Sequence, residues 1–241
     1  MRFARTAQLV GEEKMERLRG ARVAVCGLGA VGSYAVEALA RAGVGYLRLV
    51  DFDTVDTVNI NRQLYALDST VGTLKVEVAG ERVRDINPSC ETDLRPTFID
   101  DASIPELLGG DVDVVVDAID SVSSKVNLLE GAFRRGLHTV SSMGAAARLD
   151  VSAIHVTDIS ESYNCPLART IRQRLRRRGI DRGIRCVFSP EQAYNKLPPV
   201  VREEPRASRG RERAPLGSIS FVTGIFGLKA ASAAIHHILE I

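Results

Sequence analysis

The sequence predicts an α/β fold in which a Rossmann-like, doubly wound and mainly parallel sheet carries an antiparallel C-terminal extension. Short apolar runs of strand length alternate with helix-like segments through the first two thirds of the chain, as they do where crossover helices join parallel strands. A G-x-G-x-x-G pattern follows the first apolar run, at the point where a doubly wound sheet turns from strand to helix. We expect residues 1–241 to form a single domain.

The alternation covers the segment from about residue 20 to residue 145, which we expect to be the nucleotide-binding core. Strands are predicted over residues 22–27, 46–51, 112–120 and 137–142, and helices over residues 31–41, 72–86 and 123–135. The run VDVVVDAID is almost continuously apolar and β-branched, which suits a strand buried on both faces. The helix over residues 72–86 has an apolar face and ends before Pro88.

Beyond Gly144 the pattern becomes less regular. A further strand is predicted over residues 153–158, a basic helix over 167–179 and a charged, Pro- and Arg-rich loop over 198–215. The basic segment spans about residues 165–215, and an apolar helix follows over about residues 218–240. Lys229 and the polar residues of its last turn interrupt that helix within less than a membrane-spanning length. We therefore expect a core or interface helix and no membrane association.

Composition excludes several other classes of protein. With 45% hydrophobic and 26% charged residues, the chain is typical of a soluble globular protein. The first 22 residues contain no apolar stretch before their charges, so we expect neither a secretory signal nor a transit peptide, and a cytoplasmic location. The four cysteines form no C-x-x-C pair, which argues against a zinc ribbon and a disulfide scaffold; they are Cys26, Cys90, Cys165 and Cys186.

The glycine pattern predicts a nucleotide site. Gly27 permits a tight turn, Gly29 lets a phosphate approach the backbone, and Gly32 lets the following helix pack on the strand. Amides at the start of that helix favour negative charge. Asp51 ends the next strand and is placed to accept hydrogen bonds from ribose hydroxyls, a role that Asp53 could share or take. Three glycines in a tight turn without a ligand are the structural alternative.

Polar and charged residues then accumulate where the strands are expected to end. They are Asn59, Asn61, Arg62, Gln63, Lys75, Asp117 and Asp120. Because the carboxyl ends of parallel strands open on one crevice, these side chains can converge on one ligand. Arg and Lys neutralise charge on phosphoryl oxygens and an Asp can hold Mg²⁺, so the set fits a triphosphate better than a hydride carrier. Taken singly, Arg62 or Lys75 would be read as a solvated helix charge.

The stretches GLGAVGS, LVDFDTVDTVNINRQ, VGTLK and DAID, in this order and spacing, resemble the ubiquitin-activating-like adenylating enzymes of the ThiF, MoeB and HesA type. The resemblance covers nearly the whole chain and implies activation of a carboxylate with ATP and Mg²⁺. It implies that Arg62 and Lys75 contact the phosphates, that Asn59 lies near the phosphates or the metal, that Asp51 holds the ribose and that Asp120 holds the metal.

The same resemblance has implications for assembly and for other cofactors. Arg5, within RFARTAQL, matches an arginine that members of the family insert into the site of the partner subunit, which implies a homodimer and a catalytic role for Arg5. No zinc is expected, because the paired C-x-x-C ligands of sulfur-carrier-activating relatives are absent. The sequence leaves open whether a monovalent cation is bound. It also leaves open whether a cysteine desulfurase or sulfur acceptor is a partner.

Within the family, NRQLYALDSTVGTLKVEV, RDINP, SSMGAAARLD, VTDIS and GIRCVFS resemble the branch that dehydrates threonylcarbamoyladenosine in tRNA. Members of this branch adenylate the carboxylate of the threonylcarbamoyl group, which then closes into a ring with loss of AMP. Some relatives carry a Cys just before the last helix, where this chain reads APLG, so thiolate catalysis from that position is not expected. A buried or bystander role is expected for Cys165 and Cys186.

The basic helix is the candidate tRNA surface. From Arg169 to Arg185 the chain carries eight Arg and one Asp, a local excess of +7 in a chain of net charge +2. An apolar stripe of Leu167, Ile171 and Leu175 can anchor the helix, and acidic residues that would interleave the arginines are missing. We expect contacts with tRNA phosphates from Arg172, Arg174, Arg177 and Arg178. A surface helix without a ligand is the structural alternative.

Three other functions stay open from the sequence. One is adenylation of the C-terminal Gly-Gly of a ubiquitin-like sulfur-carrier protein. Bound zinc would support this function. Another is a nucleotide-binding module without catalysis, which would consume no ATP with any tRNA. The third is an NAD-dependent oxidoreductase, which would bind NAD tightly.

Overall fold

The computed structural model describes residues 2–194 and 216–241. These residues form a seven-stranded sheet with the strand order β3-β2-β1-β4-β5-β7-β6. The strands are β1 (Arg22–Cys26), β2 (Tyr46–Val50), β3 (Glu91–Arg95), β4 (Val114–Asp117), β5 (His138–Ser142), β6 (His155–Asp158) and β7 (Arg185–Phe188). All neighbouring strands are parallel except β6 and β7. The doubly wound, mainly parallel sheet and its antiparallel extension are therefore confirmed.

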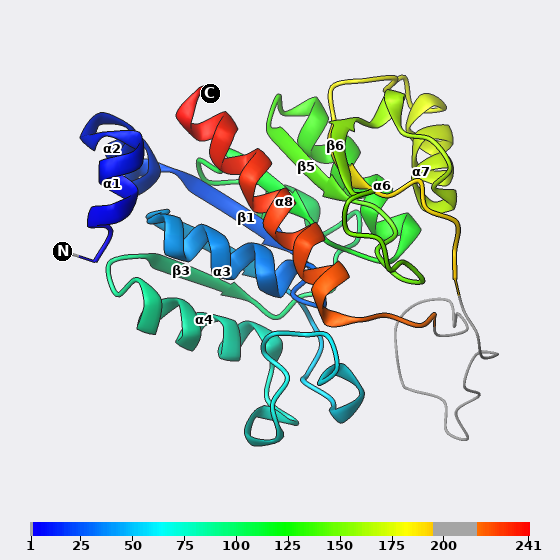
Figure 1. Ribbon diagram of the computed structural model, residues 1–241. Helices are drawn as coiled ribbons and strands as arrows, with labels where there is room; N and C mark the ends of the chain where they lie inside the picture. Colours follow the sequence, from blue (N-terminus) through cyan, green and yellow to red (C-terminus); the bar gives the residue numbers. More distant parts are fainter. Residues whose placement is uncertain (1, 195–215) are drawn as a thin grey trace.

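Helices cover both faces of the sheet (Figure 1). They are α1 (Ala4–Val10), α2 (Glu12–Gly20), α3 (Gly32–Ala42), α4 (Lys75–Ile86), α5 (Ile104–Leu107), α6 (Val122–Arg134), α7 (Pro166–Arg176) and α8 (Ser220–Leu239). Three 3-10 helices lie between them: η1 (Thr57–Asn59), η2 (Asp68–Thr70) and η3 (Ile159–Glu161). Helices α3, α4 and α8 pack on one face of the sheet, and α5, α6 and α7 on the other.

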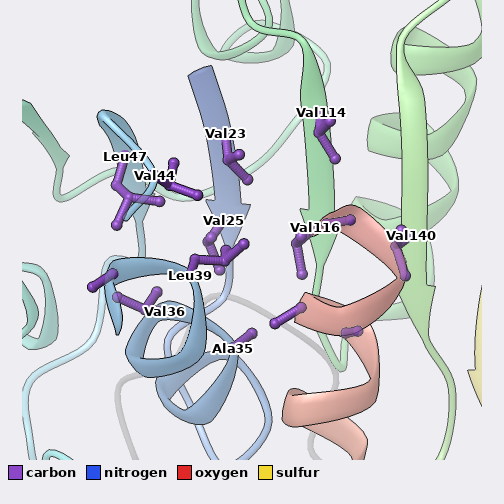
Figure 2. Packing of buried hydrophobic residues seen from close by; sticks show 14 of the residues in the cluster. Val23, Val25, Ala35, Val36, Leu39, Val44, Leu47, Val114, Val116 and Val140 are labelled. Atoms are coloured by element: carbon purple, nitrogen blue, oxygen red, sulfur yellow. The ribbon is translucent and has the colours of Figure 1, made fainter. Parts of the chain in front are cut away.

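Alternation along β1 supplies both halves of the core. Val23 and Val25 belong to the hydrophobic cluster shared with α3 and α8, whereas Ala24 and Cys26 belong to the cluster shared with α5 and α6. Figure 2 shows the first of these clusters, in which Leu39 of α3 lies beside Val25. Each central strand is buried on both faces, so apolar runs without alternation are the expected sequence pattern.

Helix α8 is the one helix in the described part of the chain that is long and apolar enough to cross a membrane. Its mean hydropathy is 1.3, and half of its most apolar stretch is buried. The helix packs beside α3 and against β4 and β5, as the red ribbon in Figure 1 shows. It thus contributes to the core of the domain.

Several elements differ from the sequence-based prediction. Strands β3 and β7 and helices α1, α2 and α5 were not predicted. Helix α4 begins at Lys75 instead of residue 72, because Gly72 has a left-handed φ of 88° and Leu74 bridges to Thr54. The loop predicted over residues 198–215 lies outside the described residues.

The order of the strands fixes where a ligand can bind. From β1 the chain winds outward through β2 to β3, and then returns to β4 and winds through β5 in the opposite direction. Such a reversal leaves a crevice at the carboxyl ends of the two central strands, because the crossover connections diverge there. In this chain the strand order reverses between β1 and β4, so we expect the crevice at their carboxyl ends, bordered by the segments after β2 and β5.

Candidate nucleotide site

The glycine turn joins the end of β1 to α3. Gly27 has a φ of 90°, and a Cβ atom there would lie 2.8 Å from the carbonyl oxygen of Ala118. A Cβ on Gly32 would lie 1.8 Å from the carbonyl oxygen of Gly27. By contrast, the nearest heavy atom to a Cβ on Gly29 is Nε2 of Gln63, at 3.7 Å. Gly27 and Gly32 therefore serve close packing, whereas Gly29 leaves space at the backbone.

The first turn of α3 has no side-chain cap. Its N-cap residue, Val31, makes no side-chain hydrogen bond to the helix, and the helix runs for 11 residues. The first amide groups of an α-helix have no partner within the helix, and the helix dipole favours negative charge beside them. A phosphate group at this position would satisfy both.

Asp51 holds the glycine turn against the end of β2. One carboxylate oxygen accepts a hydrogen bond from the amide of Leu28 at 2.6 Å, and the other accepts one from the amide of Asp53 at 2.9 Å. Burial raises the pKa of Asp51 above its ordinary value, although the charge of Lys75 and the two amide donors oppose this effect. Each oxygen retains a second lone pair, so the carboxylate can shape the turn and also accept a ribose hydroxyl.

Lys75 is the first residue of α4, and its charge acts on the carboxylate of Asp51. Its Nζ atom forms a 2.9 Å ion pair with Asp53, and its side chain is only 6% exposed, against 47% for that of Asp53. The amide of Lys75 also donates to the carbonyl of Asp53. The ammonium group is thus held at the end of β2 by a carboxylate at the surface, which a phosphate could replace.

Asn59 and Arg62 lie in the segment after β2. Asn59 is buried, and its Oδ1 atom accepts from the amide of Asp56 in a capping box around η1. The guanidinium of Arg62 donates to the carbonyl of Val58 at 2.7 Å and to the side chain of Asn61 at 2.9 Å. Both residues therefore have an ordered local structure.

The two carboxylates after β4 occupy different environments. Asp117 is fully buried, accepts from Nζ of Lys125 at 2.6 Å and from Ser141 at 2.5 Å, and its second oxygen accepts from the amide of Ile119. Asp120 lies at the surface in the loop that follows. Asp117 therefore fixes the loop, and Asp120 is the carboxylate of the pair that solvent or a metal ion can reach.

Lys125 is a residue that the sequence-based analysis missed. It is fully buried in α6, and its ammonium also donates to the carbonyl of Ser142 at 3.0 Å. A signal was present, because Lys125 shares the helical spacing of Val122, Val126 and Leu129, all of which are buried. A lysine on the apolar face of a helix needs a partner in the core.

Arg5 lies far from this crevice within one chain. It is exposed on α1, which sits beside the C-terminal ends of α3 and α4: Phe3 adjoins Gly43, and Arg2 donates to the carbonyl of Ile86. Those ends of the crossover helices lie at the amino edge of the sheet, whereas the glycine turn lies at the carboxyl edge. The other predicted nucleotide-site residues come together at the carboxyl edge.

Helix α7 packs as its apolar stripe predicted. Ile171 and Leu175 are fully buried, and Leu167 packs against the same cluster. Its arginines differ in their surroundings, however. Arg172 donates to the carbonyl and hydroxyl oxygens of Ser162 at 2.7 and 2.6 Å, so its guanidinium is part of the protein structure.

Other elements supply acidic partners that the sequence of α7 lacks. Arg178 forms a 2.5 Å ion pair with Glu130 of α6, and Arg176 lies 3.5 Å from Asp181. The expectation of an unpaired positive face is therefore wrong for these two arginines. One acidic partner comes from α6, which is distant in sequence, and the other comes from the segment that follows α7. Arg174 and Arg177 are exposed and form no ion pair with any described residue.

None of the four cysteines is positioned as a reactive thiolate. All four are buried, and none forms a disulfide. Burial raises the pKa of the Cys90 thiol to about 11 and that of Cys186 to about 12. Burial also raises the pKa of Cys26. In the described part of the chain, no group of three or more His, Cys, Asp or Glu side chains is arranged to hold a metal ion.

Several known proteins are similar to this chain in sequence. The model of the ThiF family matches residues 3–241. The tRNA threonylcarbamoyladenosine dehydratase of Bacillus subtilis (strain 168) is 40% identical over 233 residues, covering 94% of this chain and 90% of that protein. The molybdopterin-synthase adenylyltransferase of Escherichia coli (strain K12) is 38% identical over 152 residues, covering 62% of this chain and 60% of that protein.

A solved structure extends the similarity to three dimensions. The crystal structure of the E. coli tRNA N6-threonylcarbamoyladenosine dehydratase in complex with ATP superimposes with a TM-score of 0.88 at 34% identity. The match covers 99% of this chain and 94% of the E. coli chain.

Proposed function

The chain belongs to the ThiF family, and we propose that it is a cytoplasmic enzyme that uses ATP to dehydrate threonylcarbamoyladenosine in tRNA. The similarity to named dehydratases extends over more than nine tenths of the chain, whereas the similarity to the molybdopterin-synthase adenylyltransferase covers 62%. The sulfur-carrier alternative also lacks its paired cysteines here. The dehydratase activity is therefore favoured over adenylation of a sulfur-carrier protein.

One observation carries the proposal: a glycine turn with an open backbone at Gly29, two cations and a surface carboxylate all follow strands on either side of the reversal of the strand order. The turn at Gly29 and the first turn of α3 would hold the triphosphate, and Arg62 and Lys75 would neutralise its charge. A triphosphate that entered beside Lys75 would compete with Asp53 for the ammonium. A hydride carrier has no comparable need for this charge.

The proposed reaction has two steps. An oxygen of the threonylcarbamoyl carboxylate attacks the α-phosphorus of ATP, the bond to the β-phosphate oxygen breaks, and pyrophosphate leaves. A nitrogen or oxygen atom of the ureido group then attacks the acyl carbon of the resulting acyl-adenylate and closes the ring. The ureido group loses a proton, and AMP leaves with the former carboxylate oxygen. The protein contributes by holding two anions close together and by stabilising the charge that develops on the phosphates.

The residues present fit a Mg²⁺ ion that arrives with the nucleotide. Such an ion takes one or two carboxylates and completes its coordination with phosphate oxygens and water. Asp120 is exposed in the loop after β4 and would supply the carboxylate, whereas Asp117 is occupied by Lys125 and Ser141. When bound, the ion would neutralise phosphate charge in the crevice.

We further propose that the enzyme acts as a homodimer in which Arg5 enters the site of the partner. Within one chain Arg5 lies at the opposite edge of the sheet from the crevice, so it can reach a nucleotide only in another chain. An apolar surface is available for association: Phe221 and Leu228 lie seven residues apart on α8 and are each 47% exposed. Exposed Ile60 lies near the start of the same helix, because its neighbour Asn61 donates to the carbonyl of Ser218.

Mixed dimers test the role of Arg5. Neither Arg5→Ala nor Asp120→Ala chains alone should be active. A mixture of the two should recover activity, because one of the two sites in a mixed dimer has both residues. Absence of recovery, once subunit exchange has been shown by mass spectrometry, would refute the action of Arg5 in trans.

The tRNA would be bound in part by α7. Arg174 and Arg177 have the exposure that contact with a phosphate backbone requires, and arginine binds phosphate oxygens with two donors at once. Arg178 could exchange its ion pair with Glu130 for a phosphate, whereas Arg172 would support η3 from within the protein.

Site variants test the adenylation itself. Arg62→Ala, Lys75→Ala and Asp120→Ala should each lower tRNA-dependent release of AMP and pyrophosphate by about 10²-fold or more, as loss of one preorganised charge commonly does. Arg174→Ala is the matched control, since it should change the KM for tRNA more than the rate at saturation. Near-parent turnover in all three site variants would refute the proposal.

A further inference from the structure

Arg148 differs from the other buried cations of this protein. The described residues include four Lys or Arg side chains that are buried, and three of them face a carboxylate. The pairs are Arg48 with Asp93 at 2.8 Å, Lys75 with Asp53 at 2.9 Å and Lys125 with Asp117 at 2.6 Å. Arg148 is 5% exposed and forms no ion pair with any described residue.

The guanidinium of Arg148 is also poor in hydrogen bonds. Nη1 donates to the carbonyl of the preceding residue, Ala147, at 3.1 Å, and Nε has no partner. Arginine stays protonated in proteins, so the charge cannot be removed by titration. A buried charge without a counterion is costly and persists where function requires it. We propose that Arg148 binds the carboxylate of the substrate.

The backbone around Arg148 is held in a strained conformation. Ala147 has a left-handed φ of 57°, which is uncommon for a residue with a Cβ atom. Its amide donates to the carbonyl of Gly217 at 2.7 Å, and its carbonyl accepts from the amide of Tyr194 at 2.9 Å. Strain of this kind persists only where neighbouring structure fixes it, and it is concentrated at functional sites.

The position of this segment connects Arg148 with the crevice. Residues 143–148 follow β5 at the carboxyl edge of the sheet, where Met143 donates to the carbonyl of Val187 in β7 and Ala147 accepts from Tyr194. Gly217, which binds Ala147, is followed by Ser218, whose carbonyl accepts from Asn61 in the segment that carries Arg62. Gly217 and Ser218 therefore link the segment of Arg148 by hydrogen bonds to the segment that carries Arg62.

The placement favours a carboxylate over the other anions in the reaction. The glycine turn, Arg62 and Lys75 belong to the half of the crevice formed by β1 and β2, and they already supply the charge that a triphosphate needs. Arg148 follows β5, on the other side of the reversal in strand order, which leaves it for the second reactant. Its low exposure suits one small oxyanion better than an extended phosphate backbone.

Such a contact would serve the proposed adenylation, on which this inference rests. The substrate carboxylate and ATP are both anions, so bringing one oxygen to the α-phosphorus is opposed by charge repulsion. Arginine can hold one carboxylate oxygen with paired donors while the other oxygen attacks. Arg148 would then bind and orient the substrate without taking part in proton transfer.

Affinity measurements on two tRNAs test this assignment. The full-length protein is titrated, with a non-hydrolysable ATP analogue present, with tRNA that carries the threonylcarbamoyl group and with the same tRNA lacking it. Arg148→Met should erase the preference of the parent for the modified tRNA, a loss of about 10- to 100-fold for a charged hydrogen bond. Arg148→Lys should retain part of the preference, and ATP affinity should stay within about twofold.

Other outcomes would overturn the inference. A fall in ATP affinity with the preference intact would assign Arg148 to the nucleotide phosphates. An equal loss with both tRNAs would assign it to the tRNA backbone. Arg48→Met is the matched control: it breaks a buried ion pair outside the crevice, so it should lower Tm and leave the preference unchanged.

Melting curves provide a test that does not depend on turnover. Without ligand, Arg148→Met should melt at or above the temperature of the parent, since an apolar side chain replaces a buried charge that no described carboxylate compensates. N-acetylthreonine should raise the Tm of the parent more than N-acetylthreonine amide does, and this difference should vanish in the variant. A lower Tm of the variant, or no difference between the two compounds with the parent, would refute the carboxylate site.

These results separate the inference from the proposed function. Turnover by the parent with an unaltered tRNA preference in Arg148→Met would refute the inference and leave the dehydratase activity in place. A carboxylate effect on Tm that depends on Arg148, in a protein without turnover, would support the anion site and refute the proposed function.

Discussion

The fully buried ion pair between Lys125 and Asp117 allows a quantitative prediction for Lys125→Met. The substitution removes the 2.6 Å contact to Asp117 and the 3.0 Å hydrogen bond to the carbonyl of Ser142. Removing one partner of a buried pair costs about 3–5 kcal/mol. Asp117 keeps two donors, the amide of Ile119 and the hydroxyl of Ser141, so we expect a loss of about 3 kcal/mol in the free energy of unfolding.

Thermal and urea denaturation measure this loss. For a domain of this size, a loss of about 3 kcal/mol corresponds to a fall in Tm of roughly 6–12 °C. The double variant Lys125→Met with Asp117→Leu should recover most of that stability, since an apolar pair of similar volume has no charge to bury. Catalytic turnover should not recover, because Asp117 would no longer hold the amide of Ile119 beside Asp120. A single variant as stable as the parent would refute the reasoning.

Three further predictions concern other parts of the molecule. Gly29→Ala should keep the Tm of the parent, but its affinity for ATP, measured by calorimetry, should fall about tenfold or more. Gly32→Ala, with its Cβ 1.8 Å from a backbone oxygen, should lower both the Tm and the ATP affinity. Unchanged ATP binding by Gly29→Ala would contradict the phosphate turn. Replacing Arg174 and Arg177 by Glu should weaken tRNA binding and flatten its salt dependence by somewhat less than one unit of slope per lost contact; a parent-like slope would count against α7. Burial lowers the pKa of His138 from 6.5 to about 4, so the unfolded chain binds the proton first and stability should fall as pH drops from about 6.5 towards 4; His138→Gln should remove that part of the slope.

The sequence predicted the strands of the sheet centre more completely than the periphery. Strands β1, β2 and β4 are short apolar runs buried on both faces, so they stand out in the sequence. Strand β3 reads ETDLR and lies at the edge of the sheet, half-exposed, where polar residues are tolerated. Helix α1 is only seven residues long, and α2 is short and largely polar, so both depend on packing against the rest of the domain.

For the site, sequence reasoning predicted residue types better than their partners. The glycine turn and Asp51 follow from local spacing, and the structure places them together. That Asp117 binds Lys125, or that Arg178 binds Glu130, depends on packing between elements distant in sequence. The burial of Arg148 without an ion pair among the described residues had no local signal, because an arginine beside alanines is unremarkable until its surroundings are known.

The measurement that tests the central claim most directly is mass spectrometry of nucleosides from tRNA incubated with the enzyme and ATP. We predict that threonylcarbamoyladenosine is converted to a product lighter by one water, with one AMP released per nucleoside converted. Conversion should require ATP and should be lost in Asp120→Ala. Unchanged threonylcarbamoyladenosine, with an enzyme shown to bind both ATP and the modified tRNA, would contradict the account.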